Sequence, residues 1–321
     1  MAGTAPRRVL VDAPPYPIET IRQLLEGTGV AVESPPRPWT GDDVVGLLVD
    51  RPITAADFDR LPALLVVASN SAGVDHIDLA AATRLRVWVC NVPDYCVDEV
   101  ADTTIALLLA LFRGTVFLDR SVREGTWSDH AAGPLPTVTG ARLGIVGFGR
   151  IGRAVARRAL GLGMIVSATD PQVDSSSIAE LGVHSATFDE LLENSNALTL
   201  HLALTPQTRG MIGRRELALM PPGAYLVNAA RGPLVDQAAL MAALETGHLA
   251  GAALDVLEVE PPTAEHPIPH HPRLIVTPHA AWYSPEAERE VYRRAALSVR
   301  AVLEGRVPEG AVLAPSPKSS A

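Results

Sequence analysis

Lysine is almost missing from this chain of 321 residues, and the single one, Lys318, lies in a terminal stretch rich in proline and serine. A Schiff base needs a lysine amine, and a Walker-type loop needs a lysine that reaches the phosphates of a nucleotide. The body of the chain offers neither, so the sequence excludes both kinds of site.

Cysteine and long apolar runs are also scarce. Cys90 and Cys96 are too few for a disulfide framework or a cysteine zinc site, and they favour a reducing compartment. The first apolar run, Val9–Val11, stops at Asp12, and no later run approaches the about 20 residues that a membrane span needs. We therefore expect a soluble, cytoplasmic protein with no membrane partner.

Positive charge is outweighed by negative charge. The formal net charge is −9 and there is no basic run, which gives no support to nucleic-acid binding. Three histidines, His266, His270 and His271, crowd a proline-rich segment without helical spacing. We interpret this segment as a solvated loop and expect no metal. The composition is globular, and the length predicts two domains.

A glycine fingerprint stands near the middle of the chain. The apolar run Leu143–Val146 leads into Gly147-x-Gly149-x-x-Gly152, and a helical pattern follows. In a dinucleotide-binding fold the first glycine permits a tight turn, the second lets a pyrophosphate approach the backbone, and the third lets the helix pack on the strand. The new helix end offers free amides and a favourable dipole to phosphates.

The acid that completes the fingerprint is Asp170, which ends the next apolar run, Met164–Thr169. A carboxylate at this strand end binds the diol of a ribose and repels a 2′-phosphate. A lone glycine motif is often an ordinary loop, but strand, helix and acid here occur in register. The sequence therefore predicts NAD as the cofactor, in preference to NADP.

Short apolar runs alternate with helical stretches on both sides of the fingerprint. Before it, the runs are Arg8–Val11, Val30–Val32, Val44–Val49, Leu64–Ala68 and Val87–Val89; from it onward they include Ala197–Leu200, Ala224–Val227, Gly251–Leu254 and Leu274–Thr277. This alternation is typical of parallel sheets with helices on both faces. The fold class is therefore α/β, with two doubly wound parallel-sheet domains.

Three polar residues follow successive predicted strands of the second domain. Arg231 comes after Ala224–Val227, Glu260 after Gly251–Leu254, and His279 after Leu274–Thr277. The carboxyl ends of parallel strands share one edge of a sheet, where ligands bind. Each residue alone is more often a surface charge, but their joint placement behind a dinucleotide fold predicts a catalytic site.

These residue types suit hydride transfer to a 2-keto acid. A guanidinium holds a carboxylate or carbonyl with a planar geometry that lysine lacks. A protonated imidazole donates to the carbonyl oxygen while a hydride reaches its carbon. A carboxylate behind the imidazole fixes its tautomer and favours its charged form.

Several motifs together resemble the D-isomer-specific 2-hydroxyacid dehydrogenase family. They extend from about Val44 to Pro308 and comprise Ala72–Leu79 (AGVDHIDL), Asn91–Pro93 (NVP), Gly147–Gly152 (GFGRIG), Asn228–Gly232 (NAARG), Gly251–Val256 (GAALDV) and Thr277–His279 (TPH). Within the family, His279–Ser284 (HAAWYS), Val100–Thr104 (VADTT) and Arg123–Thr126 (REGT) resemble the C-terminal-binding-protein branch.

The resemblance implies a role for each matching residue. Arg231, Glu260 and His279 would be the catalytic set, Ser71, Ala72 and Gly73 would hold the substrate carboxylate through their amides, and Trp282 would line the substrate pocket. Besides the three glycines, the cofactor would contact Thr104, Arg150, Ile151, Asp170, His201, Ala229 and Asp255. A Rossmann cofactor domain, 98–290, would be inserted into a flavodoxin-like substrate domain formed by 1–97 and 291–321, and the chain would form a homodimer.

One departure from the branch concerns the substrate. The C-terminal binding proteins carry an arginine where this chain has Ser69, so a cationic substrate contact is missing or is supplied from elsewhere. We expect an NAD-dependent 2-keto acid reductase that acts on a small 2-keto or 2-hydroxy acid. An NAD(H)-sensing interaction protein and a phosphite-type dehydrogenase stay open as alternatives, whereas formate oxidation is disfavoured by a glutamate, not a glutamine, at Glu260.

Overall fold

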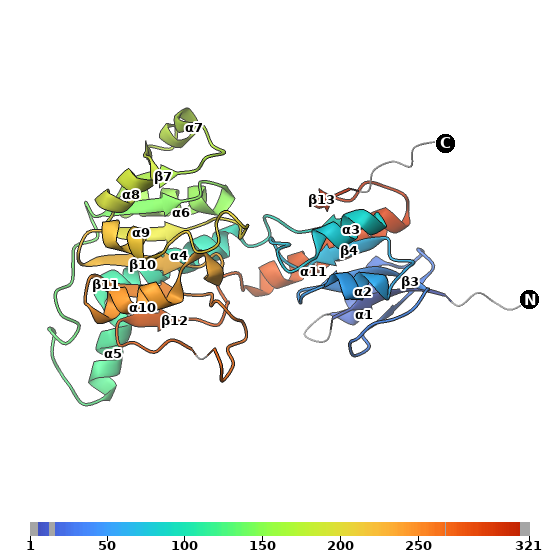
Figure 1. Cartoon of the computed structure of the whole chain (residues 1–321), viewed down its shortest axis with the longest axis horizontal. Helices are drawn as coiled ribbons and strands as arrows, with labels where there is room; N and C mark the ends of the chain where they lie inside the picture. The colour runs from blue at the N-terminus through green and yellow to red at the C-terminus, as the bar shows by residue number, and fades with distance from the viewer. Residues whose placement is uncertain (1–5, 13–16, 267, 315–321) are drawn as a thin grey trace, which may run out of the picture. The chain divides into compact units, whose positions relative to one another are not determined.

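The computed structural model describes residues 6–12, 17–266 and 268–314 (Figure 1). It divides into two compact units, one formed by Met1–Tyr95 with Ser284–Ala321 and the other by Cys96–Tyr283. We call them unit 1 and unit 2 and describe each by itself. Both are α/β, as the alternation of the sequence predicts.

Unit 1 holds a six-stranded sheet in the order β13-β5-β4-β3-β1-β2, in which β13 is antiparallel to β5 and the other pairs are parallel. Its elements are β1 (Arg7–Val11), α1 (Ile18–Leu24), β2 (Val30–Glu33), β3 (Val44–Val49), α2 (Ala55–Asp59), β4 (Val66–Ser69), α3 (Leu79–Leu85), β5 (Trp88–Cys90), α11 (Pro285–Leu303) and β13 (Ala311–Leu313). Helices α1 and α11 cover one face of this sheet, and α2 and α3 cover the other. Apolar side chains of the central strands fill both cores because every residue of β3 and β4 is buried.

Unit 2 holds a seven-stranded, fully parallel sheet in the order β12-β11-β10-β9-β6-β7-β8. Its strands are β6 (Arg142–Val146), β7 (Ile165–Thr169), β8 (His184–Ser185), β9 (Ala197–Leu200), β10 (Ala224–Asn228), β11 (Leu249–Leu254) and β12 (Leu274–Val276). Its helices are α4 (Val97–Arg113), α5 (Thr115–Arg123), α6 (Arg150–Gly161), α7 (Ser175–Ala179), α8 (Phe188–Asn194), α9 (Arg214–Leu219) and α10 (Gln237–Glu245). Core residues from α4 and α6 lie on one face, and those from α8, α9 and α10 on the other.

The borders between the units differ slightly from the expected ones. The sequence placed them at 97 and 290, whereas the units part after Tyr95 and after Tyr283. The second shift has a local cause, since α11 is one unbroken helix whose start is capped by the Ser284 side chain, which accepts from the Ala287 amide. A border at 290 would cut this helix.

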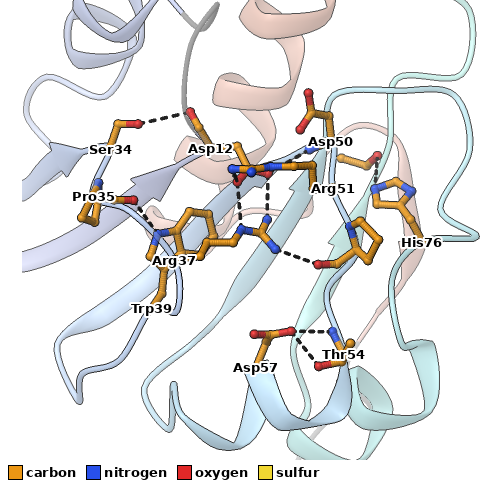
Figure 2. A network of polar contacts seen from close by, with 12 residues as sticks. Asp12, Ser34, Pro35, Arg37, Trp39, Asp50, Arg51, Thr54, Asp57 and His76 are labelled. Carbon is orange, nitrogen blue, oxygen red and sulfur yellow. Dashed lines mark hydrogen bonds and ion pairs between the residues drawn. The ribbon is translucent and has the colours of Figure 1, made fainter. Parts of the chain in front are cut away.

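A buried carboxylate connects the loops at the carboxyl edge of the unit 1 sheet through hydrogen-bonded ion pairs (Figure 2). Asp12, which follows β1, is fully buried and accepts from Arg37 at 2.7 and 2.9 Å and from Arg51 at 2.7 Å. The Arg37 guanidinium also lies over the ring of Trp39, 4.4 Å from its centroid. Two cations thus compensate one buried charge.

No single helix among the described residues is long and apolar enough to cross a membrane. Helices α4 and α5 reach that length and composition only together, and they are bent by 59° at the break between them.

Candidate active site

The glycine fingerprint forms the turn from β6 into α6. Gly147 has a φ of +93°, and a Cβ built on Gly152 would lie 2.2 Å from the Gly147 carbonyl oxygen, so strand and helix meet too closely for any side chain there. A Cβ on Gly149 would meet nothing within 4 Å. Because no side chain caps α6 either, its first amides face open space that suits a pyrophosphate.

Asp170 stands beside this turn. One carboxylate oxygen accepts from the Phe148 amide and the other from the Gln172 amide, both at 2.8 Å. The acid at the end of β7 is therefore fixed against the glycine loop, as the fingerprint requires.

The other residues expected at the cofactor lie in different environments. Arg150 and Ile151 begin α6, and Ala229 follows β10 with partial exposure. Thr104 is fully buried in α4, where its hydroxyl donates to the Val100 carbonyl at 2.7 Å. His201 follows β9 with intermediate exposure, and the burial of its ring lowers its pKa to about 3. His201 is consequently neutral at physiological pH.

Parallel pairing of β10, β11 and β12 brings together the segments that follow them. Arg231 is extended after β10, and the Asn228 side chain holds it by donating to its carbonyl at 2.8 Å. A Cβ on Gly232 would lie 1.9 Å from the Leu257 carbonyl oxygen, so glycine lets this turn pack directly on the segment that carries Glu260.

His279 and Glu260 form a hydrogen-bonded pair. The His279 Nδ1 lies 2.5 Å from one Glu260 oxygen, and the other oxygen accepts from the Leu257 amide at 2.6 Å. The side chains are 42% and 32% exposed, so the pair is open to a small ligand. Burial alone would raise the pKa of Glu260, but the hydrogen bond and charge of His279, the Leu257 amide and the Arg231 charge together lower it. Glu260 is therefore a carboxylate whose charge acts on the imidazole.

The sequence of this chain is similar to known proteins of one enzyme family. Residues 105–281 match the model of the D-isomer specific 2-hydroxyacid dehydrogenase NAD binding domain. The chain is 41% identical, over 84% of its length and 82% of the relative's, to a glyoxylate reductase of Korarchaeum cryptofilum. The chain belongs to the D-isomer-specific 2-hydroxyacid dehydrogenase family.

Two further likenesses bear on this dehydrogenase. It is 39% identical over 74% of its length to a D-3-phosphoglycerate dehydrogenase of Bacillus subtilis, but it covers only 45% of that protein. The structure of a D-lactate dehydrogenase from Aquifex aeolicus in complex with NAD and lactic acid matches with a TM-score of 0.82 and 26% identity, covering 92% of this chain and 96% of that one.

The dehydrogenase is an NAD-dependent oxidoreductase that acts on a CH–OH group, with a hydroxy acid as substrate. Its own residues fit the cofactor: the uncapped helix start suits the pyrophosphate, and Asp170 suits a ribose diol. Among the described residues, no cluster of three or more His, Cys, Asp or Glu side chains could hold a metal ion.

The loop expected to hold the substrate carboxylate lies in unit 1 of the dehydrogenase. The hydroxyls of Ser69 and Ser71 donate to the Gly73 carbonyl at 3.1 and 2.6 Å, and Asn91 donates to the Ala72 carbonyl at 2.6 Å. The amides of residues 71, 72 and 73 donate to no acceptor within the described ranges. Successive free amides of this kind bind anions.

Two further residues of the candidate site, Trp282 and Thr277, follow β12. Trp282 is partly exposed and packs edge-on against Tyr283, with ring centroids 5.6 Å apart. Thr277, which the sequence singled out only as part of a motif, donates its hydroxyl to Asp255 at 2.6 Å. Motif position alone does not reveal that bond, because its acceptor lies 22 residues earlier in the chain.

Proposed function

We propose that this dehydrogenase reduces small 2-keto acids to D-2-hydroxy acids with NADH and catalyses the reverse oxidation. The observation that carries the proposal is the His279–Glu260 hydrogen bond of 2.5 Å at the sheet edge that also bears Arg231. An imidazole paired with a carboxylate is the usual acid and base for a carbonyl or alcohol oxygen.

Each residue then has one task. Bound NADH supplies the hydride. His279 donates a proton to the carbonyl oxygen in reduction and accepts it in oxidation, while Glu260 keeps the imidazole oriented through Nδ1. Arg231 binds the carboxylate and carbonyl oxygens of the keto acid with its planar guanidinium. The free amides of Ser71, Ala72 and Gly73 bind the substrate carboxylate.

A small substrate is favoured by the relatives. The glyoxylate reductase named above shares 41% of its residues over most of both chains, and glyoxylate is the smallest 2-keto acid. The chain also lacks an arginine at Ser69, and Ser69 is fully buried, so that position offers no cation to a second anionic group.

The test is a panel of 2-keto acids (glyoxylate, hydroxypyruvate, longer aliphatic and phosphonate-bearing acids) with consumption of NADH followed by absorbance. We expect turnover with the small members. His279→Ala should lower turnover at least about a hundredfold, the scale of general acid catalysis, while NADH still binds. Near-wild-type turnover by His279→Ala on every acid would refute the mechanism and favour an NAD(H)-sensing role.

We also infer that two copies form a homodimer through the surface around α5. Helix α5 buries none of its residues, Val122 is 47% exposed and Trp127, shortly after it, is 90% exposed. Exposed apolar side chains gathered in one segment are typical of interfaces. A second copy of this chain would cover these side chains. A cytoplasmic location accords with the buried free thiols of Cys90 and Cys96.

Light scattering on the intact protein after size exclusion tests this interface. We expect a mass near twice 33.9 kDa for the wild type and a shift towards 33.9 kDa for Val122→Ser combined with Trp127→Ser. A wild type that runs as a monomer, or a dimer that the double substitution leaves unchanged, would show that this surface does not join two copies.

A further inference from the structure

We propose that Asp255 and Thr277 are positioning residues that hold His279 in the backbone conformation from which it exchanges its proton. The proposal rests on the proposed function, in which His279 is the acid and base. It gives Asp255 a role besides the cofactor contact that the family resemblance implies.

The backbone of His279 is unusual. Its φ is +52°, in the left-handed region that side-chain-bearing residues seldom adopt, and it is one of two such residues outside glycine among the described part of the chain. Its amide donates to the Asp255 carbonyl at 2.7 Å and to the Thr277 carbonyl at 3.0 Å. Strained conformations of this kind persist only where surrounding bonds enforce them.

The Asp255 carboxylate supplies those bonds. It is 1% exposed, and it accepts from the Thr277 hydroxyl at 2.6 Å and from the Ala280 and Ala281 amides at 2.9 Å each. All these donors belong to residues close to His279 on its two sides. A buried carboxylate depends on such donors, so the segment is held where the donors can reach it.

The consequence for His279 is geometric. Residues 277, 280 and 281 all donate to the Asp255 carboxylate, so the turn that contains His279 is held on both sides. From this turn the His279 side chain reaches Glu260. Removing the Thr277 hydroxyl leaves Asp255 with the two amide donors only. On the side before His279 the turn then keeps only backbone hydrogen bonds, among them that of the Thr277 amide to the Leu254 carbonyl at 3.0 Å. We expect the turn to loosen and the His279–Glu260 hydrogen bond to lengthen.

A direct cofactor contact and a positioning role lead to different measurements. If Asp255 acted through the cofactor, weakening its environment would raise the dissociation constant of NADH. If it acts through His279, the same change lowers kcat, disturbs the His279–Glu260 hydrogen bond and leaves NADH affinity nearly unchanged.

The experiment compares Thr277→Val, which removes the hydroxyl at nearly constant shape, with Thr277→Ser, which keeps it. Thr246→Val is the matched control, since the Thr246 hydroxyl only donates to carbonyls at the exposed end of α10. The readouts are kcat on the best keto acid, NADH dissociation by fluorescence, and the downfield proton signal of His279 Nδ1–H, assigned by its loss in His279→Ala.

We expect Thr277→Val to lower kcat about tenfold or more and to shift or abolish the proton signal, with NADH dissociation changed less than about twofold. Thr277→Ser should restore kcat and signal, and Thr246→Val should resemble the wild type. If Thr277→Val does not fold, Thr277→Ala gives the same readouts, because it also lacks the hydroxyl that donates to Asp255.

Two results would overturn the proposal: a wild-type kcat with an unchanged signal in Thr277→Val, or a weakened NADH affinity at unchanged kcat. If the wild-type protein reduced no keto acid, the proposed function would fail by itself. The proton signal and its dependence on Thr277 would still decide whether these residues position His279.

Discussion

At the scale of single residues, the proposed mechanism depends most directly on the charge of Glu260. The pKa of this carboxyl is lowered, mainly because the His279 hydrogen bond and charge outweigh the effect of burial, so the charge persists to a pH below the ordinary glutamate range. Above that pH the Glu260 carboxylate is available to the His279 Nδ1 and keeps the imidazole oriented.

Glu260→Gln keeps the shape and removes the charge. Without the carboxylate charge, the imidazole loses the partner that stabilises it while it exchanges a proton with the substrate oxygen, so turnover in reduction at neutral pH should drop about tenfold or more. Initial rates of reduction and of oxidation measure this, with the exposed Glu258→Gln as the control. Unchanged turnover would mean that Glu260 does not act through charge.

The sequence predicted Glu260 and His279 because each lies in the segment that follows a strand, and the pattern alone identifies those strands. It did not predict what Asp255 and Thr277 do. The three donors to the Asp255 carboxylate lie 22 to 26 residues further along the chain, and only the pairing of β11 with β12 brings them to it.

At the scale of secondary-structure elements, we expect the end of β7 to determine the preference for NAD over NADP. Asp170 is braced by the Phe148 amide inside the glycine loop, so its position relative to the start of α6 is fixed. A 2′-phosphate placed there would face a carboxylate.

We therefore expect the wild type to prefer NADH. Asp170→Ala should lower the ratio of kcat/KM for NADH to kcat/KM for NADPH, chiefly because activity with NADH is lost. Asp174→Ala, which removes an exposed carboxylate four residues away, is the matched control and should leave the ratio unchanged. A wild type that uses NADPH at least as well as NADH would contradict this assignment.

Buried elements could be predicted from the sequence, and exposed ones could not. The predicted run Val44–Val49 is β3 and Ala197–Leu200 is β9, both wholly buried, so their apolar character is continuous. The strand β13 and the helix α5 were not predicted. β13 has three residues, none of them buried, and α5 has no buried residue. Neither element therefore needs the regular spacing of buried apolar residues from which a strand or helix is predicted.

At the scale of the whole molecule, α11 belongs to unit 1 although its first residue, Pro285, lies more than 200 residues after the end of β4 at Ser69. Its residues Val291, Ala295, Ala296 and Val299 enter the core beside β3 and β4. Unit 1 therefore depends on both ends of the chain, whereas unit 2 has its own two cores.

Ala296→Glu tests this dependence. Ala296 is 0% exposed, and an unpaired carboxylate there should destabilise unit 1 by more than about 3 kcal/mol. We expect calorimetry to show one transition moved to lower temperature and another, assigned to unit 2 by its response to NADH, nearly unmoved. Ala179→Glu, the same substitution at an exposed position in α7, should change neither. Equal losses in both transitions would show that the units unfold as one.

The split of unit 1 also sets an order of events during synthesis. Residues 96–283 are complete before α11 has been translated, so the cofactor-binding unit can fold while the ribosome is still adding the rest. The strands β1 to β5, made first, must wait for their covering helix with an apolar sheet face open. A nascent chain therefore exposes this apolar face from the synthesis of β1 until α11, which ends at Leu303, can cover it. During this time the chain is most prone to aggregate.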